Sequence, residues 1–186
     1  MSRIQYTDDV NGNFQEARGS DGRLNVSARS DARAYYNSRD KGQCYTVPFS
    51  HPTAGDGEYS AYWKNTSPNK TLVISSIGVN SDDIARFKLW FVSGTAANGT
   101  AFTPTNLNKT SANDAEATAL TDGGGTAISG LTEDGLIDDL RVSANGHEEF
   151  RLSDRIRLGQ NDAIAIEMDA GTSTPDVNGV IFAYYE

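Results

Sequence analysis

The chain has 186 residues, 37% of them hydrophobic, and this length fits one compact domain. Its net charge of −9 argues against the broad basic surface that non-specific nucleic-acid binding needs, so we expect no nucleic-acid partner. Cys44 is the single cysteine, so the chain forms no intrachain disulfide. The sequence has no signal-peptide core and no apolar run of about 20 residues, so we expect a chain that is made in the cytoplasm and has no membrane partner.

Residues 1–33 are the first predicted element, an extended N-terminal arm. They are polar, charged and dotted with glycine, and their few apolar residues follow no sustained period. Such a segment cannot bury enough apolar surface by itself to offset the entropy lost on ordering. Two interpretations remain open: the arm is disordered, or it becomes ordered against a neighbouring subunit or a larger surface.

Residues 34–186 are predicted to form the body from short strands. Tyr45, Val47 and Phe49 alternate with smaller or polar residues, which is the period of a half-buried strand. Pro48 interrupts this run and has no amide hydrogen to donate. We therefore expect Pro48 to lie at a sheet edge or a bulge.

The next predicted strands are residues 59–64 and 71–79, which flank the turn sequence SPNK and indicate a hairpin. The sequence FKLWFV that follows is the best candidate for a central strand. Its alternation places Phe87, Leu89 and Phe91 on one face, and Lys88, Trp90 and Val92 on the other.

The connections in the second half are less regular. Residues 93–113 predict either a loop or a pair of short edge strands, and TDGGGT at 121–126 predicts a flexible hairpin connection. Residues 129–140 allow one helical turn. The runs AIAIEMD and VIFAYYE, separated by a long loop, are typical of the last two strands of a jelly roll.

Together these elements predict an all-β fold, a jelly-roll-like antiparallel β-sandwich of about eight or nine strands. No stretch of 10 or more residues shows a helical period, which argues against a parallel sheet with crossover helices.

The sequence offers little catalytic chemistry, and we expect no enzyme, metal or cofactor. His51 and His147 lie in no local triad motif and are predicted to be surface or turn residues. Cys44 lies within a strand pattern and is predicted to be a small buried apolar residue. Acidic residues cluster at 133–139 without the spacing of a calcium loop, so a solvated acidic face is the simpler interpretation.

The most unusual local sequence is GRLNVSARSDARAYYNSRDKGQCYTV, in which arginine, tyrosine and aspartate are interleaved. Arginine and tyrosine are enriched at protein interfaces, although an exposed coil with weak local ion pairs is the alternative. We predict partner binding by a set of residues from this segment: Arg23, Arg29, Asp31, Arg33, Tyr35, Tyr36 and Arg39.

This segment, together with FKLWFVSGTA, ANGHEEFR and RLGQNDAIAIE, resembles small virion structural proteins of tailed bacteriophages. The resemblance covers most of the chain from about Gly22. It implies a β-sandwich or jelly-roll subunit mounted on a capsid or tail, often as a homotrimer, with the N-terminal segment as its anchor.

The resulting hypothesis is a non-enzymatic capsid decoration protein, located in the virion, that docks on the major capsid protein and stabilises the shell. The alternative is a receptor- or glycan-binding module of a tail or head fibre, in which loops such as 94–113 and 171–179 hold a sugar. A glycan hydrolase is a third possibility, because one sequence does not fix the separation of paired carboxylates.

Overall fold

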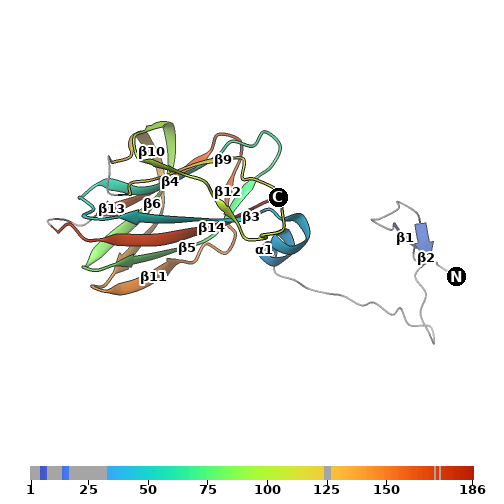
Figure 1. Ribbon diagram of the computed structural model, residues 1–186, viewed down its shortest axis with the longest axis horizontal. Coiled ribbons are helices and arrows are strands. Elements are labelled where there is room, and N and C mark those ends of the chain that lie inside the picture. Colours follow the sequence, from blue (N-terminus) through green and yellow to red (C-terminus); the bar gives the residue numbers. More distant parts are fainter. Residues whose placement is uncertain (1–4, 8–13, 17–32, 124–126, 170, 172) are drawn as a thin grey trace. The chain divides into compact units, whose positions relative to one another are not determined.

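The computed structural model describes residues 5–7, 14–16, 33–123, 127–169, 171 and 173–186. Contacts between Cα atoms divide the chain into two units, Met1–Asp31 and Ala32–Glu186. In the first unit, β1 (Gln5–Thr7) pairs antiparallel with β2 (Phe14–Glu16). The second unit, called the body below, contains the remaining elements (Figure 1).

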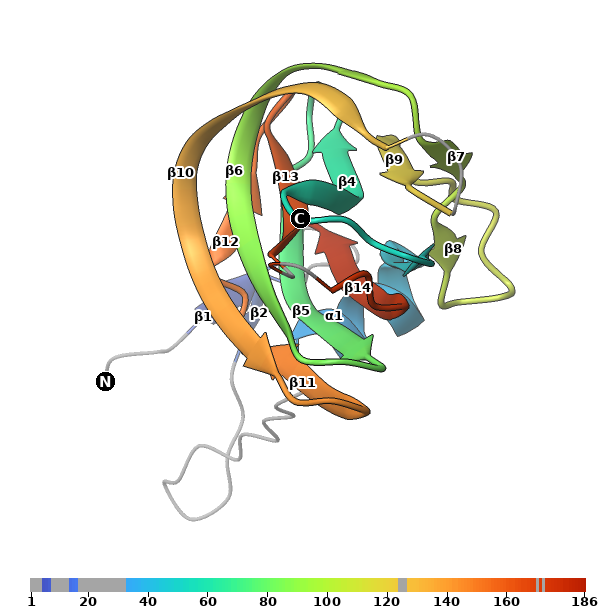
Figure 2. The same ribbon diagram turned by 90° about the vertical axis from the view of Figure 1, so that its left-hand side faces the viewer.

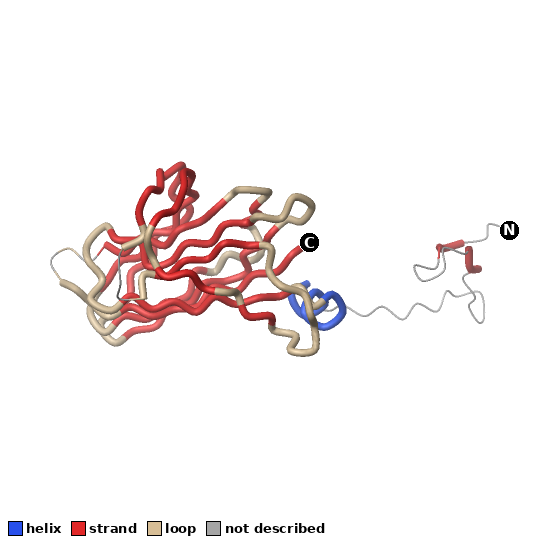
Figure 3. Tube along the Cα trace, turned by 45° about the horizontal axis from the view of Figure 1, so that its top comes forward, coloured by secondary structure: helices blue, strands red, loops and turns tan. Residues whose placement is uncertain are grey.

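The body consists of two antiparallel sheets and one short helical segment (Figures 1 and 3). The helical segment, residues 33–41, combines α1 (Arg33–Tyr36) with the π-helical turn η1 (Asn37–Lys41). Sheet I contains, in spatial order, β10 (Ser129–Val142), β6 (Ala85–Ala97), β13 (Ala163–Asp169), β4 (Glu58–Asn65), β9 (Ala117–Thr121) and β7 (Thr100–Phe102). Sheet II contains β11 (Gly146–Phe150), β5 (Leu72–Ser81), β14 (Val177–Tyr185), β3 (Cys44–His51) and β8 (Thr105–Asn106), with β12 (Ile156–Leu158) also paired to β5.

The core lies between the inner faces of the two sheets. Because side chains alternate along a strand, Phe87 and Leu89 of β6 point inward with their register partners Met168 and Ile166 of β13, and all four are fully buried. From the other sheet, Tyr45 and Tyr185 meet edge to face with ring centroids 5.8 Å apart, and additional side chains of both sheets complete one cluster. These contacts confirm the predicted all-β sandwich, whereas the jelly-roll connection pattern stays a prediction.

Trp90 lies on the outer face of sheet I, as the alternation predicted. It is half-buried and packs beside a smaller outer cluster that includes Tyr62 and Val92. Its indole Nε1 donates a hydrogen bond to Glu167 Oε2 at 2.5 Å. Its strand β6 lies between β10 and β13, which confirms the interior position predicted for this run (Figure 2).

The edges of both sheets follow the predictions for Pro48 and for residues 93–113. Residues 93–113 supply β7, which forms one edge of sheet I, and β8, which forms one edge of sheet II. The two-residue strand β8 pairs only with Tyr45 and Thr46, so it leaves Pro48 at the open side of β3, where its missing donor costs no ladder hydrogen bond.

Several predictions about individual elements were wrong. The described chain has twelve strands in the body instead of eight or nine, because several strands are only two to five residues long. The segment 33–41 is helical, and the helical turn considered at 129–140 is instead the strand β10. Residues 59–64 and 71–79 form no hairpin, because β4 and β5 lie in different sheets.

The segment 121–126 joins no hairpin either. Strands β9 and β10, which flank it, are not neighbours in sheet I. Residues 124–126 lie outside the described part of the chain, so the connection itself has no structural description. Among the described residues, no helix has the length and apolar character to cross a bilayer.

Candidate interaction surface

The helical segment contains four of the seven residues predicted to bind a partner. Arg33, Tyr35 and Tyr36 lie in α1, and Arg39 lies in η1. The structure therefore places these four residues in one short helical segment. The other three predicted residues lie outside the described residues: Arg23, Arg29 and Asp31.

Asparagine side chains from the loop around β8 hold the end of the helical segment. Asn108 Nδ2 donates to the carbonyl oxygen of Ser38 at 3.0 Å, and Asn113 Nδ2 donates to that of Lys41 at 3.0 Å. Asn106 Nδ2 donates to the carbonyl oxygen of Gly42 at 2.9 Å. Carbonyl groups at a helix end have no intrahelical donors, so these amides supply the missing partners. The loop therefore fixes the helical segment to the body.

Gly42 ends the helical segment in the left-handed region, with φ of 59°. A Cβ atom at this position would lie 2.3 Å from Ser111 Oγ. The position therefore requires glycine both for its backbone conformation and for the close approach of the loop.

The aromatic side chains of the helical segment are exposed and accompanied by cations. Tyr35 is 51% exposed, and the Arg39 guanidinium lies 5.1 Å from its ring centroid. Tyr36 is 42% exposed, with the Lys41 ammonium 5.8 Å from its ring centroid. Large exposed apolar groups and arginine are the features that concentrate binding energy at protein interfaces.

Arg33 has a different position from the other three. Its Nη1 donates to Glu186 Oε1 at 2.5 Å, and this hydrogen bond raises the pKa of the guanidinium. The same carboxylate also pairs with Arg157. Arg33 therefore connects the helical segment to the last residue of the chain.

A groove of about 380 Å³ lies between the helical segment and the outer face of sheet II. Tyr35 and Ala34 line one side, and Phe182 of β14 lines the other. Leu107, 47% exposed, extends the apolar lining from the β8 loop. We call the helical segment and this groove together the docking surface.

Cys44 lines the same groove, but its side chain is only 5% exposed. Burial raises the pKa of its thiol, which disfavours the nucleophilic thiolate. The prediction of a small buried apolar residue is confirmed.

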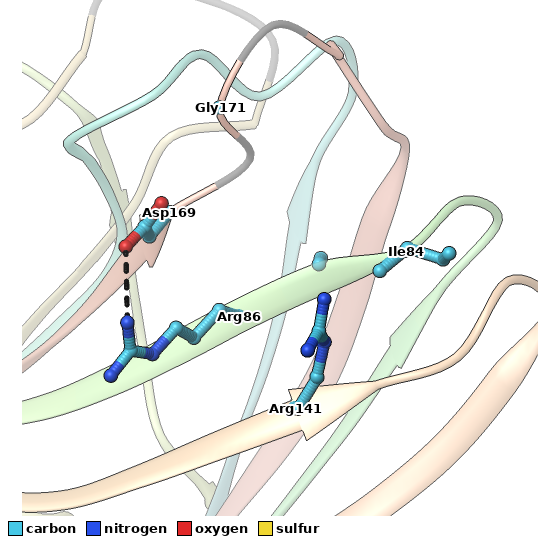
Figure 4. Close-up of a pocket in the computed structure, with 6 residues that line it drawn as sticks. Ile84, Arg86, Arg141, Asp169 and Gly171 are labelled. Carbon is cyan, nitrogen blue, oxygen red and sulfur yellow. Dashed lines mark ion pairs between the residues drawn. The ribbon is translucent and has the colours of Figure 1, made fainter.

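A second cavity, of about 530 Å³, opens near Gly171, where β6 begins and β10 ends (Figure 4). Arg86 and Arg141 lie directly opposite each other in the β6–β10 register. Arg86 pairs with Asp139 in a two-point contact and lies 3.9 Å from Asp169. This cavity is thus lined by both signs of charge.

His51 forms a buried polar network that the sequence did not indicate. Its side chain is only 2% exposed, which contradicts the predicted surface or turn position. Its Nδ1 lies 3.0 Å from Ser60 Oγ, and its Nε2 lies 3.3 Å from Glu58 Oε2 and 3.5 Å from Asp122 Oδ2. The four residues come from β3, β4 and the end of β9, so only the folded sandwich brings them together.

The His51 network has the residue types of a hydrolytic triad without the access that one needs. Ser60 has no exposed surface, so a substrate carbonyl cannot reach its Oγ in this arrangement. With its proton on Nε2, His51 donates to the carboxylates while its Nδ1 accepts from Ser60. This geometry satisfies buried polar groups and holds β3 against β4.

The remaining candidates lie at the surface. His147 is exposed, as predicted, and its Nδ1 lies 2.6 Å from Asn80 Oδ1. The acidic residues of β10 accept hydrogen bonds from Tyr59 and Ser93 and pair with Arg86. Among the residues that the structure describes, no group of three or more histidine, cysteine or acidic side chains is placed to hold a metal ion.

Comparison with protein-family models and with curated proteins finds no match to this chain.

Proposed function

We propose that this protein is a non-enzymatic structural component of a tailed-phage virion, a capsid decoration protein that docks on the major capsid protein and stabilises the shell. The observation that carries the proposal is the docking surface, in which Tyr35, Leu107 and Phe182 line one groove. Tyr36 is also exposed on the same helical segment. The assignment to a virion comes from the sequence resemblance described above.

Rigid presentation of the helical segment supports a role in binding. Its end is fixed by Asn106, Asn108 and Asn113, so little conformational freedom remains to be lost when a partner binds. Its cations, Arg33, Arg39 and Lys41, outnumber its single acidic residue, Asp40, in a chain whose net charge is −9. The helical segment is therefore suited to an apolar or acidic patch of the partner, and the acidic remainder of the chain would repel an acidic patch.

In this proposal the protein stabilises the shell by binding alone. Surface buried between the docking surface and neighbouring shell subunits adds binding free energy to the assembled state alone. The expected effect is a shell that resists heat and dilution better, with no covalent bond made or broken.

Co-sedimentation with capsids that lack this protein tests the proposal. The full chain should co-sediment and raise the temperature at which the capsids release their contents. Replacing both Tyr35 and Tyr36 by alanine should weaken binding at least about ten-fold, because each buried aromatic anchor contributes about 1–2 kcal/mol. Leu136→Ala is the matched control, since Leu136 is 49% exposed on β10, an edge strand of the other sheet. Equal binding by the tyrosine variant would contradict the proposal.

A fibre-borne glycan-binding module is the second candidate, and the cavity near Gly171 favours it. Its lining combines the guanidinium of Arg141, the carboxylate of Asp169 and the exposed apolar side chain of Ile84, which together can hold a sugar. A glycan array separates the two candidates. Saturable binding that Arg141→Ala abolishes supports the fibre module, and binding to capsids alone supports the decoration protein.

A further inference from the structure

Exposed arginines lie along the edge of sheet II next to the docking surface. Ser75 and Ser76 of β5 line the groove, and β12 pairs with β5 on the side away from β14. Ile156 and Leu158 of β12 are buried, so the alternation of the strand directs the exposed Arg157 to the outer face. This strand therefore presents a cation beside the groove.

The strand register relates these arginines to the groove. Four residues form one outward-facing row across β12, β5, β14 and β3: Arg157, Val73, Tyr184 and Cys44. Cys44 lines the groove, so this row reaches from the groove to Arg157. Arg155 is exposed two residues earlier, and the β12–β5 register continued by one pair places it beside Ser75. Arg151 is exposed directly after the end of β11, which also pairs with β5. We call Arg151, Arg155 and Arg157 the basic edge.

The basic edge has more positive charge than nearby carboxylates neutralise. Arg157 shares the carboxylate of Glu186 with Arg33. The other two arginines of the basic edge form no ion pair with any residue that the structure describes. Asp154 lies in the same stretch of sequence, but it is only partly exposed and its Oδ1 is buried. A chain with a net charge of −9 thus has a local positive surface beside its apolar groove.

The positive surface is limited in extent. Glu148 and Glu149 are exposed on β11, opposite Val79 and Gly78 of β5. The outer face therefore changes from basic to acidic along this edge of the sheet, and the basic part is the one that adjoins the groove. An anionic partner is attracted to the groove end alone.

We propose that the groove and the basic edge together bind an extended acidic segment of the partner protein, with one apolar side chain in the groove and carboxylates on the arginines. This inference rests on the proposed docking function and names the chemistry of the segment that docks. Phe182 and Leu107 line the groove and favour an apolar side chain, and guanidinium groups bind carboxylates in a two-point geometry. A polysaccharide or a nucleic acid supplies anions but no apolar side chain, and the net charge of −9 repels a long polyanion.

The dimensions of the site fit a short segment. The groove of about 380 Å³ is near the lower limit of pockets that bind small ligands, so it accommodates one or two side chains. The row from Cys44 to Arg157 crosses three strand spacings of about 4.8 Å, and an extended segment of about four or five residues spans that length. Exposed ion pairs contribute little each, so the expected affinity is modest.

Titration of a short fluorescent peptide with the purified full chain tests the inference without any capsid. The probe has one phenylalanine flanked by glutamates, and about 0.1 M salt screens charges beyond about 10 Å. Fluorescence anisotropy should show saturable binding with a dissociation constant on the order of 0.1–1 mM. A peptide with serine in place of phenylalanine, and one with glutamines in place of the glutamates, should each bind at least about five-fold more weakly.

Charge reversal identifies the residues that bind the carboxylates. The double variant Arg151→Glu, Arg155→Glu should weaken binding of the glutamate peptide at least about ten-fold and leave binding of the glutamine peptide unchanged. Lys64→Glu is the matched control, because it makes the same change of charge at a partly exposed position on β4 of sheet I. Near-identical circular dichroism of the variants verifies their fold. Undiminished binding by the double variant, or equally tight binding of the serine peptide, the glutamine peptide or a single-stranded oligonucleotide, would each overturn the inference.

Capsid co-sedimentation separates this inference from the proposed function. Capsid binding by wild type that the double variant retains in full would overturn the inference and leave the docking function standing. Specific binding of the glutamate peptide by a chain that fails to bind capsids would contradict the docking function and support the inference. The expected result is that the double variant loses both capsid and peptide binding, whereas Lys64→Glu keeps both.

Discussion

Tyr35 of α1 and Phe182 of β14 line opposite sides of one groove, although they lie near opposite ends of the sequence. Tyr35 reaches this position because asparagines from a third segment, the loop around β8, hold the helical segment in place. The docking surface is thus a product of tertiary structure, and its integrity depends on the residues that fix residues 33–41.

Gly42→Ala should loosen the docking surface. The new Cβ would lie 2.3 Å from Ser111 Oγ and the backbone would keep φ of 59°, so we expect a loss of about 2 kcal/mol and faster hydrogen exchange in residues 33–43. Gly57→Ala is the control: its φ is 75° but no described atom lies within 4 Å of the added Cβ, so the loss should be about 1 kcal/mol. Equal losses for the two variants would show that contact with Ser111 is unimportant.

His51→Ala should destabilise the sandwich by about 3 kcal/mol. The substitution leaves the buried Asp122 carboxylate and the Ser60 hydroxyl without their histidine partner, in addition to opening a cavity. Urea unfolding at neutral pH measures the free energy of unfolding. His147→Ala, at an exposed position, should change it by less than about 0.5 kcal/mol, and a comparably small effect at His51 would contradict the structural role assigned to the network.

Replacing Trp90 separates packing from hydrogen bonding on the outer face of sheet I. Trp90→Ala should cost about 2 kcal/mol, less than a fully buried tryptophan, because the side chain is only half-buried. Trp90→Phe keeps a ring but removes the donor to Glu167, and should cost about 1 kcal/mol. A loss above about 4 kcal/mol for the alanine variant would indicate a core position.

The ion pair between Arg86 and Asp139 predicts a pH dependence of stability. The hydrogen bond from Arg86 holds the pKa of Asp139 below its ordinary value of 3.8. A carboxyl with a lower pKa in the folded state binds fewer protons than in the unfolded state, so its contribution is complete above about pH 3.8 and is lost as the pH falls further.

Asp139→Asn should therefore reduce the dependence of unfolding free energy on pH below about pH 4. Glu148→Gln, at an exposed position on β11, removes one carboxylate away from Arg86 and serves as the control. Identical pH profiles for wild type and Asp139→Asn between pH 5 and about pH 2.5 would contradict the ion pair.

The strand pattern was predictable where local alternation decides the structure. Phe87, Leu89 and Trp90 occupy the predicted faces because burial of one face of a strand imposes a period of two on the sequence. The helical segment was not predictable, since residues 33–41 are too short to show a helical period and owe their conformation to the asparagines around β8.

The candidate sites also differ in whether local sequence or tertiary structure determines them. Tyr35, Tyr36 and Arg39 could be selected from composition alone, because exposed arginine and tyrosine characterise interfaces. The groove and the His51 network could not, since Phe182 and Asp122 reach these sites only through the pairing of strands distant in sequence. In the same way, the SPNK turn predicted a hairpin, but pairing with β9 and β13 places β4 in the sheet opposite β5.

An electron-microscopy map of the assembled virion tests the central claim most directly. The account predicts the body on the shell, with Tyr35, Tyr36 and Phe182 in contact with a major capsid protein subunit. A body located at the tip of a fibre, or on the shell with residues 33–41 and the groove facing solvent, would contradict it.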